Sequence, residues 1–147
     1  MAQPTREGTK VESKPKRPIM VYVPLMTPAR TFLGVTRALI GIGSWIAPDQ
    51  TARLFGIDPT RSDRFIGRLF GARELALAGA LLVAPDSAVA PVAAVGVTVD
   101  AADAVAGFDE RRRGNLSTQA TVLGPAGALL FVALGVLVAR KASASAA

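Results

Sequence analysis

Four long apolar stretches, separated by short polar segments, dominate the pattern along the chain. They predict helices at residues 27–47, 62–84, 88–108 and 119–139, because the breaks between them are rich in Pro, Asp and Gly. Each stretch has about 20 residues, which is the length a helix needs to cross the hydrocarbon core of a bilayer. The pattern therefore predicts an all-α integral membrane protein, a bundle of four transmembrane helices.

Composition supports this class over a soluble one. Half of the residues are hydrophobic (50%), and the mean hydropathy of +0.37 is high for a soluble domain of this size. A soluble helical domain is the alternative, and the four apolar stretches argue against it. The Ala, Gly, Val and Arg richness suggests a GC-rich bacterial source, and hence the inner membrane.

The positive charge has two explanations. The formal net charge is +6, which is compatible with nucleic acid, but the Lys and Arg residues are scattered over loops and segment ends without a basic face interleaved with aromatic residues. A membrane boundary explains them better, so we expect no nucleic acid partner. The chain has no Cys and no His, which excludes disulfides, thiol chemistry and imidazole ligands.

Three parts are predicted along the chain: a basic N-terminal tail (1–26), a four-span domain (27–141) and a short C-terminal tail (142–147). Residues 1–18 contain five Lys or Arg residues and three Pro residues and almost nothing apolar, so they cannot form a packed core. The tail is either a solvated segment that sets membrane orientation or a contact for anionic lipids or a protein partner.

Charged residues inside the apolar stretches are the most informative feature. Lone charges in mid-bilayer cost about 2.5 to 3.5 kcal/mol or more, so we expect them to pair in the bundle interior. Their depths along helices of about 1.5 Å rise per residue match in three pairs. These predicted pairs are Arg37 with Glu74, Arg73 with Asp100, and Arg68 with Asp103.

Small residues accompany these charges on the same helix faces. The first two stretches contribute Gly34, Gly41, Gly67 and Gly71, and the third contributes Gly96. Gly67 and Gly71 form a Gly-x-x-x-Gly pattern, which allows close approach of helix backbones in membranes. We therefore predict that these glycines mark the helix contacts.

Two interpretations of the charges remain open. They are either a structural network that fixes which helices meet, or a functional one in which the acids carry protons or the arginines hold an anionic or quinone-like headgroup. Asp100 and Asp103 lie one turn apart and could chelate a metal, but the nearby arginines favour ion pairs. No cofactor, metal, nucleophile or phosphate-binding motif is predicted.

Two short motifs suggest a family. A Leu-Phe-Gly-Ile loop at 54–57 precedes a Gly-x-x-x-Gly-Ala-Arg-Glu-Leu segment at 67–75, and together they resemble uncharacterised small four-helix bacterial membrane proteins. That resemblance implies the four-span architecture and no particular activity. The layout is also similar to the DoxX-like family, which would imply a quinone-linked or complex-subunit role.

The function predicted from these features is a scaffold or accessory subunit of a larger membrane assembly. The alternative is a lipid- or quinone-binding or proton-handling membrane protein that uses the charges. Partners would be membrane lipids and a protein partner or a second copy, contacted through residues 1–26. With four spans the two termini share one side with eight basic residues against six opposite, which favours cytoplasmic termini.

Overall fold

The computed structural model describes residues 26–61 and 63–146, so the predicted tail at 1–26 lies outside the described residues except for Met26. The described residues form helices and turns and no strand, which confirms the all-α prediction. The long helices are α1 (Pro28–Ile46), α3 (Arg64–Val83), α4 (Asp86–Arg112) and α6 (Gly127–Ala146). The short elements are α2 (Pro48–Leu54), the 3₁₀ turn η1 (Pro59–Arg61), α5 (Thr118–Thr121) and the π-helical turn η2 (Val122–Ala126).

Side-chain caps fix where several helices begin. The hydroxyl of Thr27 accepts a hydrogen bond from the Arg30 amide at 3.3 Å, and Pro28 occupies the first turn of α1. The Asp63 carboxylate accepts one from the Phe65 amide at 2.7 Å and caps α3. Both helices begin within two residues of the starts predicted from the sequence. Each cap accepts a hydrogen bond from an amide that the first turn of a helix leaves unpaired.

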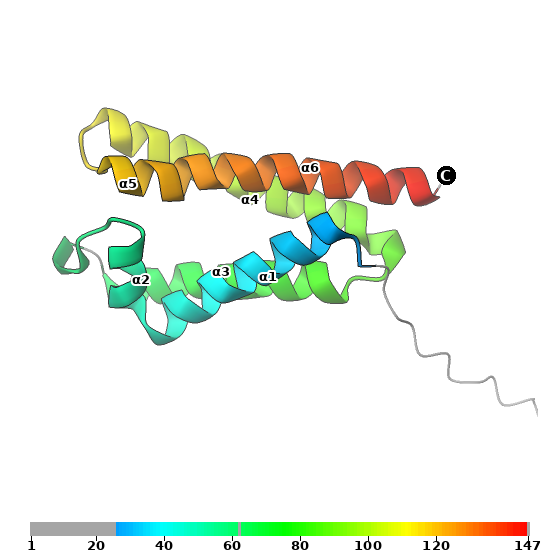
Figure 1. Ribbon diagram of the computed structural model, residues 1–147, viewed down its shortest axis with the longest axis horizontal. Helices are drawn as coiled ribbons and strands as arrows, with labels where there is room; N and C mark the ends of the chain where they lie inside the picture. The colour runs from blue at the N-terminus through cyan, green and yellow to red at the C-terminus, as the bar shows by residue number, and fades with distance from the viewer. Residues whose placement is uncertain (1–25, 62, 147) are drawn as a thin grey trace, which may run out of the picture.

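The long helices form two layers (Figure 1). One layer is α1 packed along α3, and the other is α4 packed along α6. A tight turn joins α3 and α4, yet these two helices make far less contact with each other than the helices within each layer do. The turn at residues 84–85 carries the chain from one layer to the other, and the two layers enclose the interior.

Two predicted helix ends are wrong. Helix α4 runs from Asp86 to Arg112 and absorbs charged residues that the sequence places in a loop, and α6 continues to Ala146 instead of ending at residue 139. The predicted C-terminal tail is thus helical over 142–146. Pro125 lies in the π-helical turn η2, because proline offers no amide to the helical hydrogen-bond ladder.

Two helical stretches are long and apolar enough to cross a membrane. They are Asp86–Arg112 and Thr118–Ser145, with mean hydropathies of 1.6 and 2.4. Only 28% and 17% of the residues in the apolar 18-residue segment of each stretch are buried within the chain, whereas the core helix of a soluble protein is mostly covered. Charged residues lower the hydropathy of α1 and α3, so the four predicted spans reduce to two by this measure.

Apolar packing is concentrated at the end of the molecule where α3 turns into α4. All four long helices contribute to this small core, which includes Leu33, Leu81, Val89, Ala93 and Val138. The middle of the bundle is therefore left to other side chains.

One loop glycine provides a test of the packing between α2 and α5. Gly56 has a φ of +74°, and a Cβ there would lie 2.9 Å from the side chain of Gln119. We expect Gly56→Ala to lower the free energy of unfolding by about 1 to 3 kcal/mol. The measurement is thermal unfolding in detergent. Gly79→Ala is the matched control, because Gly79 is helical with open space around it; equal stability of the two variants would contradict the packing.

Candidate functional site

Arg37 occupies the centre of the bundle. Its side chain extends from α1 and is 2% exposed. Its Nη1 donates to Glu74 Oε2 of α3 at 2.7 Å, and its Nη2 donates to Asp100 Oδ2 of α4. The guanidinium lies over the ring of Phe131 of α6, with its carbon 4.9 Å from the ring centroid. A single side chain from α1 thus contacts the other three long helices.

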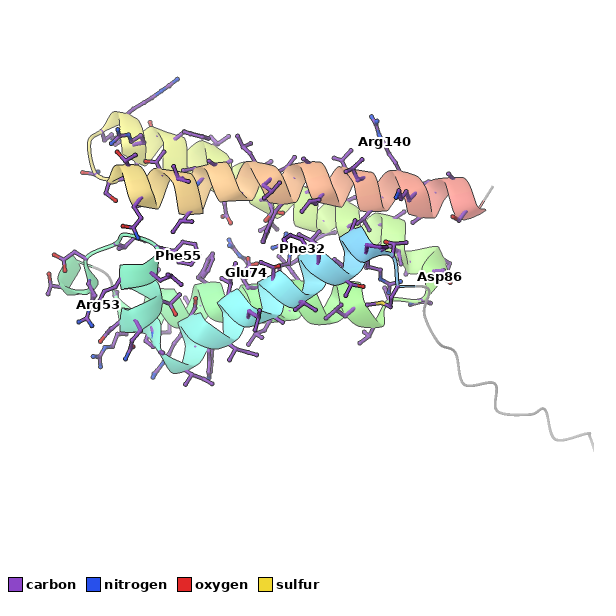
Figure 2. The ribbon with its side chains drawn as sticks, in the orientation of Figure 1. Phe32, Arg53, Phe55, Glu74, Asp86 and Arg140 are labelled. Carbon is purple, nitrogen blue, oxygen red and sulfur yellow. The ribbon has the colours of Figure 1, made fainter. Side chains whose placement is uncertain are left out.

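Arg73 forms a second centre beside the first. Its two terminal nitrogens donate to both carboxylate oxygens of Asp103, at 2.8 and 2.6 Å, and Nη2 also donates to Glu74 Oε1 at 3.1 Å. The guanidinium stacks on Phe70 at 4.8 Å. Its Nε is buried without a hydrogen-bond partner. Glu74 therefore bridges the two arginines, one through each oxygen. Figure 2 labels Glu74 in the middle of the molecule.

We call these five residues the charge network: Arg37, Arg73, Glu74, Asp100 and Asp103. Glu74 and Asp100 are each 3% exposed. The network holds two guanidiniums and three carboxylates, so its formal charge is −1 when all are ionised. Buried ions of this kind need complete pairing, since an uncompensated one is costly.

The predicted partners are right in one case. The Arg37–Glu74 pair is present, whereas Asp100 pairs with Arg37 and not with Arg73. Arg73 pairs instead with Asp103, one turn beyond Asp100 along α4.

Arg68 lies outside the charge network. The sequence pairs it with Asp103, but its side chain is exposed and its Nε donates to the Trp45 carbonyl at 3.3 Å. Arg68 stands one turn from the start of α3, where a long side chain can reach the surface. This correction removes one of the six predicted members.

Arg30 is a buried charge that the sequence did not single out as a site. It is 1% exposed, and it donates from Nε to the Leu81 carbonyl at 2.9 Å and from Nη2 to the Ala84 carbonyl at 2.6 Å. Its Nη1 lies 3.6 Å from a carboxylate oxygen of Asp86. Arg30 thus satisfies the last carbonyls of α3 and ties them to α1. Because Arg30 lies on the same face of the helix as Arg37, its burial could have been predicted from the sequence.

Backbone contact between α1 and α3 depends on two of the predicted glycines. A Cβ on Gly71 would lie 2.8 Å from the Gly41 carbonyl oxygen, and a Cβ on Gly41 would lie 2.9 Å from the Gly71 carbonyl. These helices therefore touch through their main chains. Gly67, the other glycine of the predicted motif, has only an ordinary contact of 3.5 Å with Pro48.

The remaining predicted glycines lie close to side chains. A Cβ on Gly34 would meet the Leu82 side chain at 2.5 Å, and one on Gly96 would lie 3.5 Å from Nη2 of Arg37. Gly34 is thus a tight contact between α1 and α3. Gly96 leaves the space beside the guanidinium of Arg37.

A cavity of about 530 Å³ lies against the charge network between the two layers. Its charged lining residues are Glu74, Asp100 and Asp103, and most of the rest of its lining is apolar. We call it the acidic cavity. Cavities of this volume are typical of small-molecule sites.

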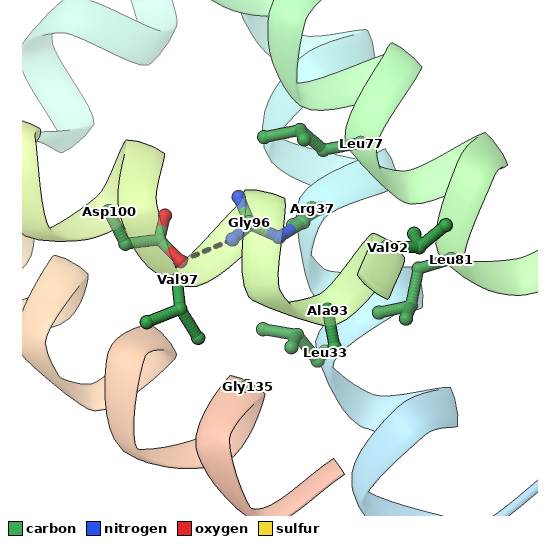
Figure 3. A pocket seen from close by; sticks show the side chains of 10 residues that line it. All are labelled: Leu33, Arg37, Leu77, Leu81, Val92, Ala93, Gly96, Val97, Asp100 and Gly135. Atoms are coloured by element: carbon green, nitrogen blue, oxygen red, sulfur yellow. Dashed lines mark hydrogen bonds and ion pairs between the residues drawn. The ribbon is translucent and has the colours of Figure 1, made fainter. Parts of the chain in front are cut away.

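A much smaller cavity lies on the other side of Arg37 and Asp100. Its volume is about 10 Å³, close to that of one water molecule. Figure 3 shows Asp100 bonded to Arg37 through one oxygen, while the other points away from the guanidinium. Asp100 lines both cavities, so its carboxylate lies between them.

An exposed ion pair links α2 to the start of α3. Arg64 donates from Nε to Asp49 at 3.0 Å, and this hydrogen bond lowers the pKa of the Asp49 carboxyl. The pair is solvated, so it contributes little to stability.

The fold and the site together define an all-helical protein with a buried charge network. No family model, curated protein or solved structure matches this chain. Within the described residues, no group of three acidic side chains is arranged to hold a metal ion. The resemblances to four-helix bacterial membrane proteins and to the DoxX-like family stay predictions, and function has to be inferred from geometry.

Proposed function

We propose that this chain is a multi-pass protein of the bacterial inner (plasma) membrane, in which α1, α3, α4 and α6 all cross the bilayer as a four-helix bundle. One observation carries the proposal: charged side chains lie buried in the middle of the bundle, while many large apolar ones face outward. Leu39, Leu69, Val95 and Leu130, one from each helix, are 50 to 65% exposed. Hydrocarbon is the solvent in which such an exterior is stable.

The charges of α1 and α3 do not prevent these helices from crossing. Hydropathy averages count Arg37 and Glu74 as if they faced lipid, yet each is at most 3% exposed because the neighbouring helices cover it. The insertion penalty of about 2.5 to 3.5 kcal/mol for a lone central charge is then offset by pairing within the bundle. Lengths of 19 and 20 residues suit a span.

The bundle acts as a scaffold or accessory subunit of a larger membrane assembly. In support, the arginines of the charge network are engaged by carboxylates from neighbouring helices, an arrangement that fixes helix positions. Residues 1–26 supply a basic segment for a protein partner, a second copy of the chain or anionic lipids.

Purification in mild detergent tests the scaffold role. We expect the full chain to purify with another protein, or with a second copy, at a fixed ratio. A chain lacking residues 1–26 should accumulate equally and lose that partner. A monomer without any protein partner, in both forms, would contradict the proposal.

Reporter fusions test the four-span topology. We expect a reporter after residue 147 to be cytoplasmic and one at Gly114, in the α4–α5 turn, to lie on the opposite side, because one crossing helix, α6, separates Gly114 from the C-terminus and three separate it from the N-terminus. A fusion at residue 58, between α2 and α3, should share the side of Gly114. Fusions at residues 58 and 114 on different sides would contradict four spans.

A ligand-binding role is the second candidate function. The acidic cavity favours it, because a purely structural network needs no space of about 530 Å³ beside its carboxylates. A bound lipid, a bound quinone or a transferred proton would each occupy the acidic cavity or its carboxylates.

A further inference from the structure

The acidic cavity has the properties of a binding site for a small molecule. Its volume of about 530 Å³ falls within the range of such sites. It is built by all four long helices together with the end of α2 and the π-helical turn η2. A ligand in it would be held between the two layers, at the level of the charge network.

The charges that reach the cavity are all negative. Glu74, Asp100 and Asp103 line it, whereas Arg37 and Arg73 approach these acids from outside the lining. With three carboxylates to two guanidiniums, the network lacks one positive charge. A cation in the cavity would supply it.

One carboxylate oxygen is available to a ligand. Asp100 has a side chain that is 4% exposed, and its Oδ2 is bonded to Arg37. Its Oδ1 has no hydrogen-bond partner within the described residues. Because Asp100 lines the cavity, an anionic oxygen that receives no hydrogen bond there favours a cation beside it.

The apolar lining selects the rest of the ligand. Phe55, Phe70 and Phe131 all line the cavity. Arg37 stacks on Phe131 and Arg73 on Phe70, so Phe55 offers its aromatic face to an organic cation, while the other two rings give hydrophobic contact. Neutral quinones and anions suit the lining less well, because Thr36 is its only side-chain donor at neutral pH and its ionised groups would repel an anion.

We propose that the acidic cavity binds a hydrophobic organic cation, with its charge next to Asp100 and its apolar groups against the three phenylalanines. This inference rests on the second candidate function and names its ligand class. It is independent of the scaffold role, because topology and co-purification can succeed or fail regardless of ligand binding.

Calorimetry with a matched pair of ions tests the proposal. Tetraphenylphosphonium is the cationic probe, and tetraphenylborate is an anion of nearly the same size and shape. The purified full chain in nonionic micelles is titrated with each, against protein-free micelles. We expect saturable binding of one tetraphenylphosphonium per chain and no saturable binding of tetraphenylborate.

Two kinds of variant locate the site. Gly124 lines the cavity with open space around its Cα, so Gly124→Leu fills the cavity without touching a charge; Gly79→Leu is its control on an exposed helix face away from the cavity. Asp103→Asn removes one charge, with Asp109→Asn as control. We expect Gly124→Leu and Asp103→Asn each to weaken cation binding by about tenfold or more, and the controls to leave it unchanged.

Several outcomes would overturn the proposal. Equal binding of the two ions, or cation binding that Gly124→Leu leaves intact, would place the probe on the apolar exterior. A phospholipid that remains bound by native mass spectrometry, resists the cation and is lost in Gly124→Leu would make the cavity a lipid site. Asp103 is partly exposed at 36%, so its variant is expected to fold.

Discussion

Arg37→Met is expected to abolish accumulation of the folded chain in the membrane. The substitution leaves Asp100 as a buried carboxylate without its guanidinium and leaves Glu74 with Arg73 alone, both acids being 4% exposed at their side chains. Removing one partner of a buried ion pair costs about 3 to 5 kcal/mol, which is a large part of the stability of a small protein. The measurement is the amount of folded protein extracted in mild detergent, with its unfolding temperature.

A triple variant that removes Arg37 together with its two carboxylate partners tests whether the loss is due to unpaired buried charges. A simple exchange of Arg37 and Glu74 is unsuitable, because it would place a glutamate against Asp100 and an arginine against Arg73. Arg37→Met combined with Glu74→Gln and Asp100→Asn removes the charge of Arg37 and the charges of both its carboxylate partners. The Arg73–Asp103 pair stays intact. We expect the triple variant to regain most of the lost accumulation. If Arg37→Met alone accumulates normally, the network does not hold the bundle together.

Gly71→Ala is expected to destabilise the pair of α1 and α3, whereas Gly67→Ala is not. The new Cβ at position 71 would lie 2.8 Å from the Gly41 carbonyl oxygen, and main-chain atoms cannot yield as a flexible side chain can. Overpacking of this kind costs about 1 to 3 kcal/mol, and more when the backbone has to move. The measurement is unfolding by sodium dodecyl sulfate in mixed micelles.

The second glycine of the same motif is an internal control. At position 67 the nearest atom, on Pro48, would be 3.5 Å from the added Cβ, an ordinary contact. Both substitutions gain the same helix propensity, up to about 1 kcal/mol relative to glycine, so the difference between them isolates the helix contact. Equal effects at 67 and 71 would contradict the close approach of the two backbones.

The position of a charge along its helix predicted only some of the ion pairs in the charge network. Counting residues along each helix places Arg37 and Glu74 at the same level, and the two are paired. Counting does not say which face of a neighbouring helix is turned inward. For that reason Asp100 was given to Arg73, and Asp103 was given to Arg68, although Arg37 takes the first and Arg73 the second.

Contacts between segments far apart in the chain could not be predicted from the sequence for a related reason. The stacking of Arg37 on Phe131 joins residues of α1 and α6, and no periodicity within either helix reveals it. The acidic cavity is a further case, because it exists only where two layers diverge around the carboxylates. Arg30 was visible as a charge on the inner face of α1, but its acceptors are carbonyls at the end of α3.

The sequence by itself determined the all-helical class, the starts of α1 and α3 and the five residues of the charge network, because these follow from local periodicity, caps and the cost of an exposed ion in an apolar segment. It did not determine that Arg30 is buried and Arg68 exposed. Only the tertiary structure decided the pairing of helices into two layers, the partners of each charge and the cavity beside them. These depend on the rotation of each helix about its own axis, which is set by packing between segments far apart in the chain.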